Sequence, residues 1–276
     1  MNDEARIAAK SDAHKDSGTS PPSEKVNKRF TLHTVDSLLR LPPPEWLVDG
    51  IIELDAFAVL YGPPGSGKSF VALDMALSLA NGVTWHTHQV KKKAVIYIAG
   101  EGGRGLGIRV AAWQKRHGID RSDAVDTFVL LEAPQLREPK DVMNLLASIR
   151  DVNDIGLVVI DTLATSFVGA DENSAQDMGK WIQGAKKIQA ETGATMLAVH
   201  HSGKADGQSE RGSSALRGAA DTMISVSKPK QGKLMTIACS KQKDAEEFKK
   251  FSLKLDCFEV QGQSRTSCVS VAGSEA

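Results

Sequence analysis

Residues 62–69, with the sequence Gly-Pro-Pro-Gly-Ser-Gly-Lys-Ser, constrain the fold of this chain more than any other segment. The apolar residues 57–61 before them predict a buried strand, and residues 70–80 after them predict a helix. A strand, a glycine-rich loop and a helix form the arrangement that a phosphate-binding loop requires. The glycines let backbone N–H groups converge on phosphate oxygens, and the helix N-terminus adds partial positive charge. We therefore predict a nucleoside triphosphate site here rather than a simple turn.

The polar side chains of this loop have distinct expected roles. Lys68 is expected to reach the β- and γ-phosphates, and the Ser69 hydroxyl is expected to ligate Mg²⁺. ATP and Mg²⁺ are therefore the expected cofactors. The residues predicted to contact the nucleotide are Gly62, Pro63, Pro64, Gly65, Ser66, Gly67, Lys68, Ser69 and Phe70.

Composition narrows the class of protein. The chain has 276 residues and a hydrophobic fraction of 41%, which suits one large α/β domain. Its formal net charge is zero and aromatics make up 5%, so neither a global positive field nor a base-stacking platform is expected. Cys239, Cys257 and Cys268 show no CxxC spacing, which is typical of a reducing cytoplasm. The sequence predicts no membrane span and no signal peptide.

Apolar and polar segments divide the chain into four parts. Residues 1–30 contain almost no large apolar side chain and are predicted to be a disordered tail. Residues 31–50 combine leucines with three consecutive prolines and are predicted to form an arm or linker. This arm docks either on a neighbouring surface or on its own domain. Residues 51–260 are predicted to form the folded domain, and residues 261–276 a polar tail.

Apolar runs alternate with helical segments through most of the folded domain. This alternation predicts a doubly wound, mostly parallel α/β sheet. The last three strands have no helices between them, which predicts an antiparallel extension at the C-terminal end. The expected strands are 57–61, 94–99, 127–131, 156–161, 194–201, 221–226, 234–240 and 251–255, and the expected helices are 70–80, 106–117, 139–152 and 176–192.

Two acidic residues follow predicted strands. Asp161 comes after an apolar run, as a Walker B aspartate that binds Mg²⁺ does, although it could instead cap the following loop. Many ATPases place a catalytic glutamate directly after this aspartate, but here Thr162 follows. Glu101 ends the second strand among glycines, and parallel strands bring their carboxyl ends to one edge of the sheet. Glu101 is therefore our candidate for activating water, with an ordinary loop acid as the alternative.

His200 and His201 end the fifth strand at the same edge. A polar residue at that place can contact the γ-phosphate and report its presence to the following loop, because a histidine can donate a hydrogen bond. Neighbouring residues of a strand point to opposite faces, so at most one of the two is expected to serve as this sensor.

Over residues 30–258 the chain resembles RecA-type ATPases and, within them, the RepA-like hexameric replicative helicases related to DnaB. The resemblance implies that Glu101 is the catalytic base and that His201 is the γ-phosphate sensor. The matching features are residues 62–69, the strand ending in Gly100 and Glu101, Asp161, the His200–His201 pair with the Ser-Gly-Lys that follows it, and the Arg-Gly-Ser-Ser-Ala-Leu segment at 211–216.

The resemblance also implies a ring in which ATP lies between subunits. DnaB-like proteins carry paired cations after a late strand, and Lys241 and Lys243 occupy that place as candidates for acting on a neighbour's nucleotide. Arg217 is an alternative. The loops that line the channel in this family correspond to residues 163–175 and 202–216.

Cationic residues of the second loop region are suited to phosphate contacts without base recognition. The candidate nucleic-acid contacts are Lys204, Arg211 and Arg217. We therefore predict an ATP-driven hexameric helicase that translocates on single-stranded DNA in plasmid or phage replication. The alternatives are a RecA-like DNA-binding recombination ATPase and a regulatory ring ATPase without DNA unwinding. A small-molecule kinase is disfavoured, because no basic lid is apparent.

Overall fold

The computed structural model describes residues 32–120, 126–202, 214–229, 233–260 and 266–273. The chain divides into two units, Met1–Pro43 and Pro44–Ala276. The described elements are α1 (Val35–Leu39), β1 (Trp46–Val48), β2 (Ile52–Glu53), β3 (Phe57–Gly62), α2 (Lys68–Asn81), β4 (Ala94–Ala99), α3 (Gly103–His117), β5 (Thr127–Leu130), α4 (Pro139–Ile149), β6 (Ile155–Asp161), the 3-10 helix η1 (Leu163–Ser166), α5 (Ala175–Thr192), β7 (Thr195–His201), α6 (Ser214–Ala219), β8 (Thr222–Ser227), β9 (Leu234–Gln242), β10 (Phe251–Glu259) and β11 (Thr266–Ala272).

A large mixed sheet organises the second unit. In the described residues its strands follow the order β11-β10-β9-β8-β3-β7-β6-β4-β5. Strands β5, β4, β6, β7, β3 and β8 run parallel to one another. Strands β9, β10 and β11 extend the sheet with antiparallel pairing. The α/β prediction, including the antiparallel C-terminal extension, is confirmed.

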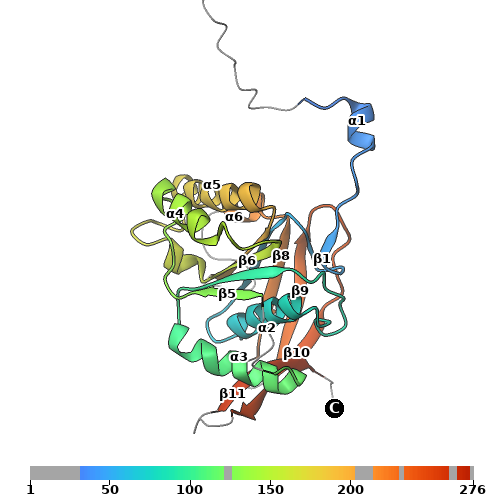
Figure 1. The fold of residues 1–276 in the computed structure, drawn as a ribbon, viewed down its shortest axis with the longest axis vertical. Coiled ribbons are helices and arrows are strands. Elements are labelled where there is room, and N and C mark those ends of the chain that lie inside the picture. The colour runs from blue at the N-terminus through green and yellow to red at the C-terminus, as the bar shows by residue number, and fades with distance from the viewer. Residues whose placement is uncertain (1–31, 121–125, 203–213, 230–232, 261–265, 274–276) are drawn as a thin grey trace, which may run out of the picture. The chain divides into compact units, whose positions relative to one another are not determined.

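The central strands are apolar because helices cover the sheet on both faces. Every residue of β3, β4 and β6 is buried. Along β3, Ala58 and Leu60 pack in a cluster with residues of α2 and α3, whereas Val59 and Tyr61 pack with α4 and α5. Figure 1 shows α4 and α5 on the side of the sheet away from α2 and α3. None of the described helices is long and apolar enough to cross a lipid bilayer.

The segment predicted to be an arm, residues 31–50, is split between the two units of the chain after Pro43. Residues 46–48 form β1, which pairs with β2, and Leu47 and Val48 are fully buried in the core of the second unit. The start of the domain predicted at residue 51 was therefore too late. In the first unit Thr34 caps the short helix α1, which has no buried residue. The predicted tail at residues 1–30 lies outside the described residues.

The prediction of a polar tail from residue 261 was wrong for residues 266–272. These residues form β11, the edge strand paired with β10. Val269 and Ser270 are buried, and the Ser270 hydroxyl donates a 2.6 Å hydrogen bond to Asp74 of α2. The segment reads as polar because serines and threonines alternate with a few apolar residues, as an edge strand permits.

Candidate active site

The phosphate loop lies between the end of β3 and the start of α2. Gly65 and Gly67 have φ values of 76° and 98°, in the left-handed region that favours glycine. A Cβ on Gly62 would lie 2.1 Å from the carbonyl oxygen of Val226, so no side chain fits there. The buried hydroxyl of Ser66 has no hydrogen-bond partner among the described residues. The glycines let the backbone of the loop approach a phosphate group closely, and the Ser66 hydroxyl can donate a hydrogen bond to it. Both features fit the phosphate group that the sequence predicts here.

Lys68 is the first residue of α2, and its side chain turns back toward the loop. Its ammonium donates to the carbonyl oxygens of Gly62 and Pro63 at 2.9 Å each, and lies 3.3 Å from Nδ1 of His201. Burial lowers the pKa of Lys68 to about 8, although the negative charges of Asp161 and Glu101 act to raise it. A buried cation thus stands where the nucleotide phosphates are expected.

Asp161 ends β6 and is buried. Its Oδ1 accepts a 3.0 Å hydrogen bond from the Ser69 hydroxyl, and its Oδ2 accepts a 2.7 Å bond from the Tyr97 hydroxyl. Burial raises the pKa of Asp161, while these two hydrogen bonds act to lower it. The described residues contain no group of three or more His, Cys, Asp or Glu side chains that could hold a metal. Ser69 and Asp161 place two oxygen ligands of the kind that Mg²⁺ prefers next to each other.

Glu101 lies at the same edge of the sheet, two residues after β4. Ala99 is in register with Asp161, and the Gly100 N–H donates to the Asp161 carbonyl oxygen at 2.8 Å. A Cβ on Gly100 would lie 2.0 Å from the Thr165 hydroxyl oxygen, so this close approach requires glycine. The Glu101 carboxylate is exposed, and its Oε1 accepts a 3.1 Å bond from the Thr162 hydroxyl.

The two histidines at the end of β7 point in different directions. His200 is 1% exposed, whereas the ring of His201 lies beside the Lys68 ammonium. Burial is the largest cause that lowers the pKa of His201, followed by the charge of Lys68. His201 is in register with Gly62 of β3, which explains why it reaches the phosphate loop.

Two residues of this site, Tyr97 and Arg109, were not predicted from the sequence. Tyr97 supports Asp161 from the neighbouring strand, and the Arg109 guanidinium of α3 lies 4.5 Å from the centre of the Phe70 ring. The positive charge of Arg109 also acts to lower the pKa of Asp161. Tyr97 carries the one polar side chain in an otherwise aliphatic strand, a signal that could have identified it. No comparable signal distinguishes Arg109 from other arginines.

Lys241 and Lys243 lie at the end of the sheet where the parallel strands begin, opposite the phosphate loop. Lys241 pairs with Met223 near the start of β8, and its ammonium donates to the Arg217 carbonyl oxygen at 2.8 Å. Lys243 forms a 3.3 Å ion pair with Asp221, which precedes β8. Because β8 runs parallel to β3, these cations are at the amino ends of the parallel strands, away from their own phosphate loop.

The predicted nucleic-acid contacts are described only in part. The Arg217 guanidinium donates a 2.7 Å bond to the Ser240 carbonyl oxygen. Lys204 and Arg211 lie outside the described residues. The other predicted channel segment, residues 163–175, begins with η1 and ends where Ser174 caps α5.

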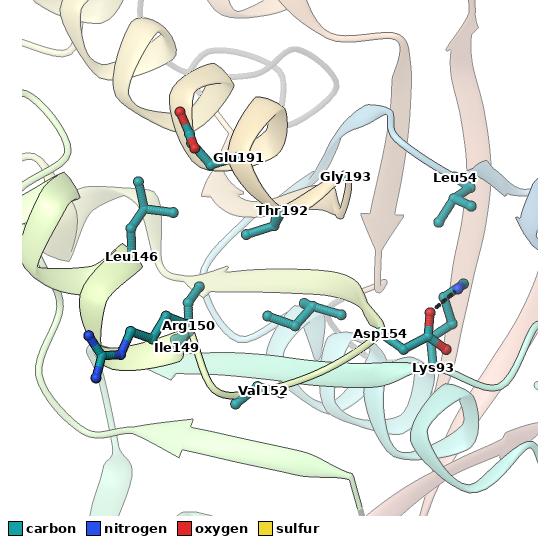
Figure 2. Close-up of a pocket in the computed structure, with 11 residues that line it drawn as sticks. Leu54, Lys93, Leu146, Ile149, Arg150, Val152, Asp154, Glu191, Thr192 and Gly193 are labelled. Carbon is teal, nitrogen blue, oxygen red and sulfur yellow. Dashed lines mark hydrogen bonds and ion pairs between the residues drawn. The ribbon is translucent and has the colours of Figure 1, made fainter.

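A cavity lies at the edge of the sheet opposite the phosphate loop. Figure 2 shows this cavity, which has a volume of about 430 Å³. Lys93, Asp154 and Gly193, which line it, precede β4, β6 and β7 respectively. None of the predicted nucleotide or metal residues lines it, so we do not assign it to the nucleotide.

Comparisons with known proteins show the family of the chain and proteins that resemble it. The model of the AAA domain family matches residues 22–207. The DNA repair and recombination protein RadB of Methanobrevibacter smithii is 25% identical over 139 residues, which are 49% of this chain and 54% of that protein. RadB of Pyrococcus horikoshii is 25% identical over 137 residues, which are 50% and 54% of the two chains. The chain thus spans about half the length of these relatives.

The fold has a solved counterpart. The crystal structure of the RadB recombinase superposes with a TM-score of 0.53 at 15% sequence identity, and the match covers 74% of this chain and 88% of that one. At this identity the match shows the fold alone. Together with the family match over more than half of the sequence, it leads to one assignment. The chain belongs to the AAA domain family, and its fold is that of the RadB recombinase.

Proposed function

We propose that this chain is an ATP-hydrolysing, DNA-binding recombination ATPase, in which ATP controls assembly on DNA. One observation carries the proposal of hydrolysis: Glu101, Asp161 and His201 follow or end three neighbouring strands around Lys68. The names of the two RadB relatives, which are DNA repair and recombination proteins, support the role on DNA.

In the proposed mechanism, the loop and the edge of the sheet hold Mg-ATP. Mg²⁺ would neutralise charge on the phosphates while the γ-phosphoryl group is transferred to water. Ser69 and Asp161 would hold this ion, while Tyr97 keeps the carboxylate oriented. Lys68 and the backbone N–H groups of the loop would bind phosphate oxygens, and the Ser66 hydroxyl could add a further donor.

Glu101 would act as the general base. The Thr162 hydroxyl fixes one carboxylate oxygen and so orients the group. The exposed carboxylate can accept a proton from an attacking water and pass it to solvent. Asp161 is less suited to this role, because both of its oxygens already accept hydrogen bonds from Ser69 and Tyr97.

His201 would sense the γ-phosphate and transmit its loss to the loop that starts at Ser202. Its ring lies 3.3 Å from the Lys68 ammonium, which would bind the same phosphate. Lys204 and Arg211 of that loop, together with Arg217, are the proposed contacts to DNA phosphates. We expect His201→Ala to reduce stimulation of hydrolysis by single-stranded DNA. Stimulation that survives intact would remove the sensor step.

Assembly would complete the site. Lys241 and Lys243 lie away from their own phosphate loop, so they could act only on a neighbouring subunit's nucleotide. Lys241 would first have to leave its carbonyl partners, and Arg217 is the alternative. We also propose that α1 is the arm that docks on a neighbouring subunit, because its apolar residues Val35 and Leu39 are not buried within the first unit. Residues 1–30 remain a proposed tail.

A second candidate function is the RepA-like hexameric helicase. The observation that favours it is the pair of cations at the end of β9, where DnaB-like helicases carry such a pair. Both functions share the same ATPase core. They differ in assembly, since a helicase forms a closed ring and a recombinase forms a filament on DNA.

Electron microscopy with a non-hydrolysable ATP analogue separates the two functions when it is combined with ATPase assays. Filaments that form only on single-stranded DNA, with hydrolysis stimulated by that DNA, would support the recombination ATPase. Closed rings without DNA would support the helicase. Hydrolysis without any salt-sensitive DNA binding would contradict both and favour a regulatory ATPase.

A further inference from the structure

Two cysteines face each other across the last two strands of the sheet. Cys257 of β10 and Cys268 of β11 are direct partners in the antiparallel register. Directly opposed residues of an antiparallel pair place their side chains on the same face, with Cβ atoms about 4.5–5.5 Å apart. Both thiols are free, and that of Cys257 is exposed while that of Cys268 is half-buried.

This geometry is close to that of a disulfide. Opposed residues of antiparallel strands have Cα atoms about 4.5 or 5.5 Å apart, depending on their hydrogen bonding. Both separations lie within the range of about 4.4–6.8 Å that disulfides span. The proximity of Cys257 is also among the causes that raise the pKa of Cys268. A disulfide holds its Cβ atoms about 3.5–4.5 Å apart, so the two strands would also have to approach each other by up to about 1 Å at this pair.

We propose that Cys257 and Cys268 are a redox modification site that forms a reversible disulfide across β10 and β11. The third cysteine, Cys239, lies in β9 and is paired in register with Ile224 of β8, so it has no opposed cysteine. Register therefore selects one pair from the three thiols of the chain.

The oxidant would be a small disulfide of the glutathione class. The exposed Cys257 thiolate attacks one sulfur of oxidised glutathione, which forms a mixed disulfide and releases one glutathione thiolate. Cys268 then loses its proton to water, and its sulfur attacks Sγ of Cys257, releasing the second glutathione. Two electrons pass from the protein to the small disulfide, which is fully reduced.

The order of attack follows from the environment of the two thiols. Burial and then the neighbouring Cys257 raise the pKa of Cys268 to about 11. Cys268 therefore stays protonated while Cys257 reacts first. Once Cys257 is in the mixed disulfide its charge is lost, and one cause of the raised pKa of Cys268 disappears.

The disulfide would hold the edge strand β11 in place, and β11 contacts α2, the helix that follows the phosphate loop. Ser270 of β11 donates to the buried carboxylate of Asp74, which also accepts bonds from the indoles of Trp85 and Trp113. Asp74 lies on α2, the helix that begins at Lys68. We expect the disulfide to restrain separation of β11 from β10 and from this network.

Trypsin provides a direct test on the full chain. Cleavage after Lys233, Lys241, Lys254 and Arg265 places each cysteine in its own peptide: 234–241, 255–265 and 266–276. After incubation of the folded protein with oxidised glutathione and alkylation of free thiols, we expect peptides 255–265 and 266–276 to be joined. Reduction should separate them, and amide exchange in β11 should be slower in the oxidised form by about tenfold.

Matched variants identify the pair. Cys239→Ser should leave the link intact, whereas Cys268→Ser should leave a glutathione adduct on peptide 255–265. Mixing isotopically heavy and light chains distinguishes links within one chain from links between chains. The proposal is overturned if the two peptides stay separate in the folded protein, if Cys239 forms the link, or if mixed heavy–light pairs dominate.

Discussion

Charged residues lie at both ends of β4 and β6, but they differ in burial and in their partners. Asp154 precedes β6 and its side chain is 66% exposed, whereas Asp161 ends β6 and is buried. Lys93 precedes β4 and pairs with Asp154, while Glu101 follows β4 and accepts a hydrogen bond from Thr162. The Lys93–Asp154 pair stabilises little, because the largely exposed Asp154 leaves it screened by water. The buried carboxylate persists only because donors from Ser69 and Tyr97 hold it.

The same difference distinguishes the cavity at the amino ends of the parallel strands from the proposed nucleotide site at their carboxyl ends. The amino edge has a cavity of about 430 Å³ but no convergent buried polar groups among the residues that line it. The carboxyl edge gathers a buried lysine, a buried aspartate and an unpaired hydroxyl around a glycine loop. We therefore place the proposed chemistry at the carboxyl edge, and paired substitutions at the two edges test this proposal.

The largest expected effect is that of Lys68→Ala. Loss of the buried cation should abolish measurable ATP hydrolysis and weaken ATP binding at least about 100-fold, since charge-assisted phosphate contacts are lost. Lys93→Ala is the matched control at the amino edge and should leave both unchanged. Calorimetric titration with ATP and a phosphate-release assay measure the two quantities. Equal losses in both variants would contradict the assignment of the carboxyl edge.

Asp161→Asn and its control Asp154→Asn compare the two ends of β6. Asp161→Asn should raise the Mg²⁺ concentration needed for half-maximal hydrolysis by about 10–100-fold, because the partner of the Ser69 hydroxyl is altered. Asp154→Asn should have no effect on this concentration. A Mg²⁺ titration of the ATPase rate measures both, and unchanged Mg²⁺ dependence in Asp161→Asn would exclude a metal role.

The lowered pKa of Lys68 predicts a pH dependence of ATP binding. Above about pH 8 the free protein holds Lys68 increasingly as the neutral amine, while phosphate binding favours the ammonium. ATP affinity should therefore fall by up to about tenfold per pH unit above pH 8, with one proton taken up on binding. Titrations in buffers of different ionisation enthalpy measure this uptake. Lys68→Arg, which stays charged, should lack it.

Tyr97→Phe should have the smallest effect. It removes one donor from the buried Asp161 carboxylate and should lower the free energy of unfolding by about 1–3 kcal/mol, measured by denaturant titration. The Tyr97 hydrogen bond acts to lower the pKa of Asp161, so its loss should move the acid limb of the pH–rate profile to higher pH. An unchanged acid limb would show that Asp161 does not set it.

Much of the parallel half of the molecule was predictable from sequence. Strands β3, β4, β6 and β7 are almost wholly buried and mostly apolar because helices cover both faces, so their ends locate Glu101, Asp161 and His201. His201 rather than His200 lies beside Lys68, a choice that strand alternation alone left open. Parallel strands carry this information because their carboxyl ends share one edge.

Long-range partners could not be predicted in this way. Strand β11 reads as polar, and its place depends on pairing with β10 and on the bond from Ser270 to Asp74. Arg109 reaches Phe70 through the packing of α3, which no local pattern encodes. The short strand β1 was likewise hidden next to three prolines. The bond from Ser270 to Asp74 and the contact of Arg109 with Phe70 each join segments far apart in the chain.

The most direct measurement is single-turnover hydrolysis by Glu101→Gln, with ATP binding measured on the same preparation. If Glu101 is the base at the carboxyl edge, the substitution should slow hydrolysis by about 10²–10⁴-fold while ATP binding stays within about twofold of the unmodified protein. Hydrolysis at the unmodified rate, with binding equally intact, would contradict this role and would require another residue to activate water.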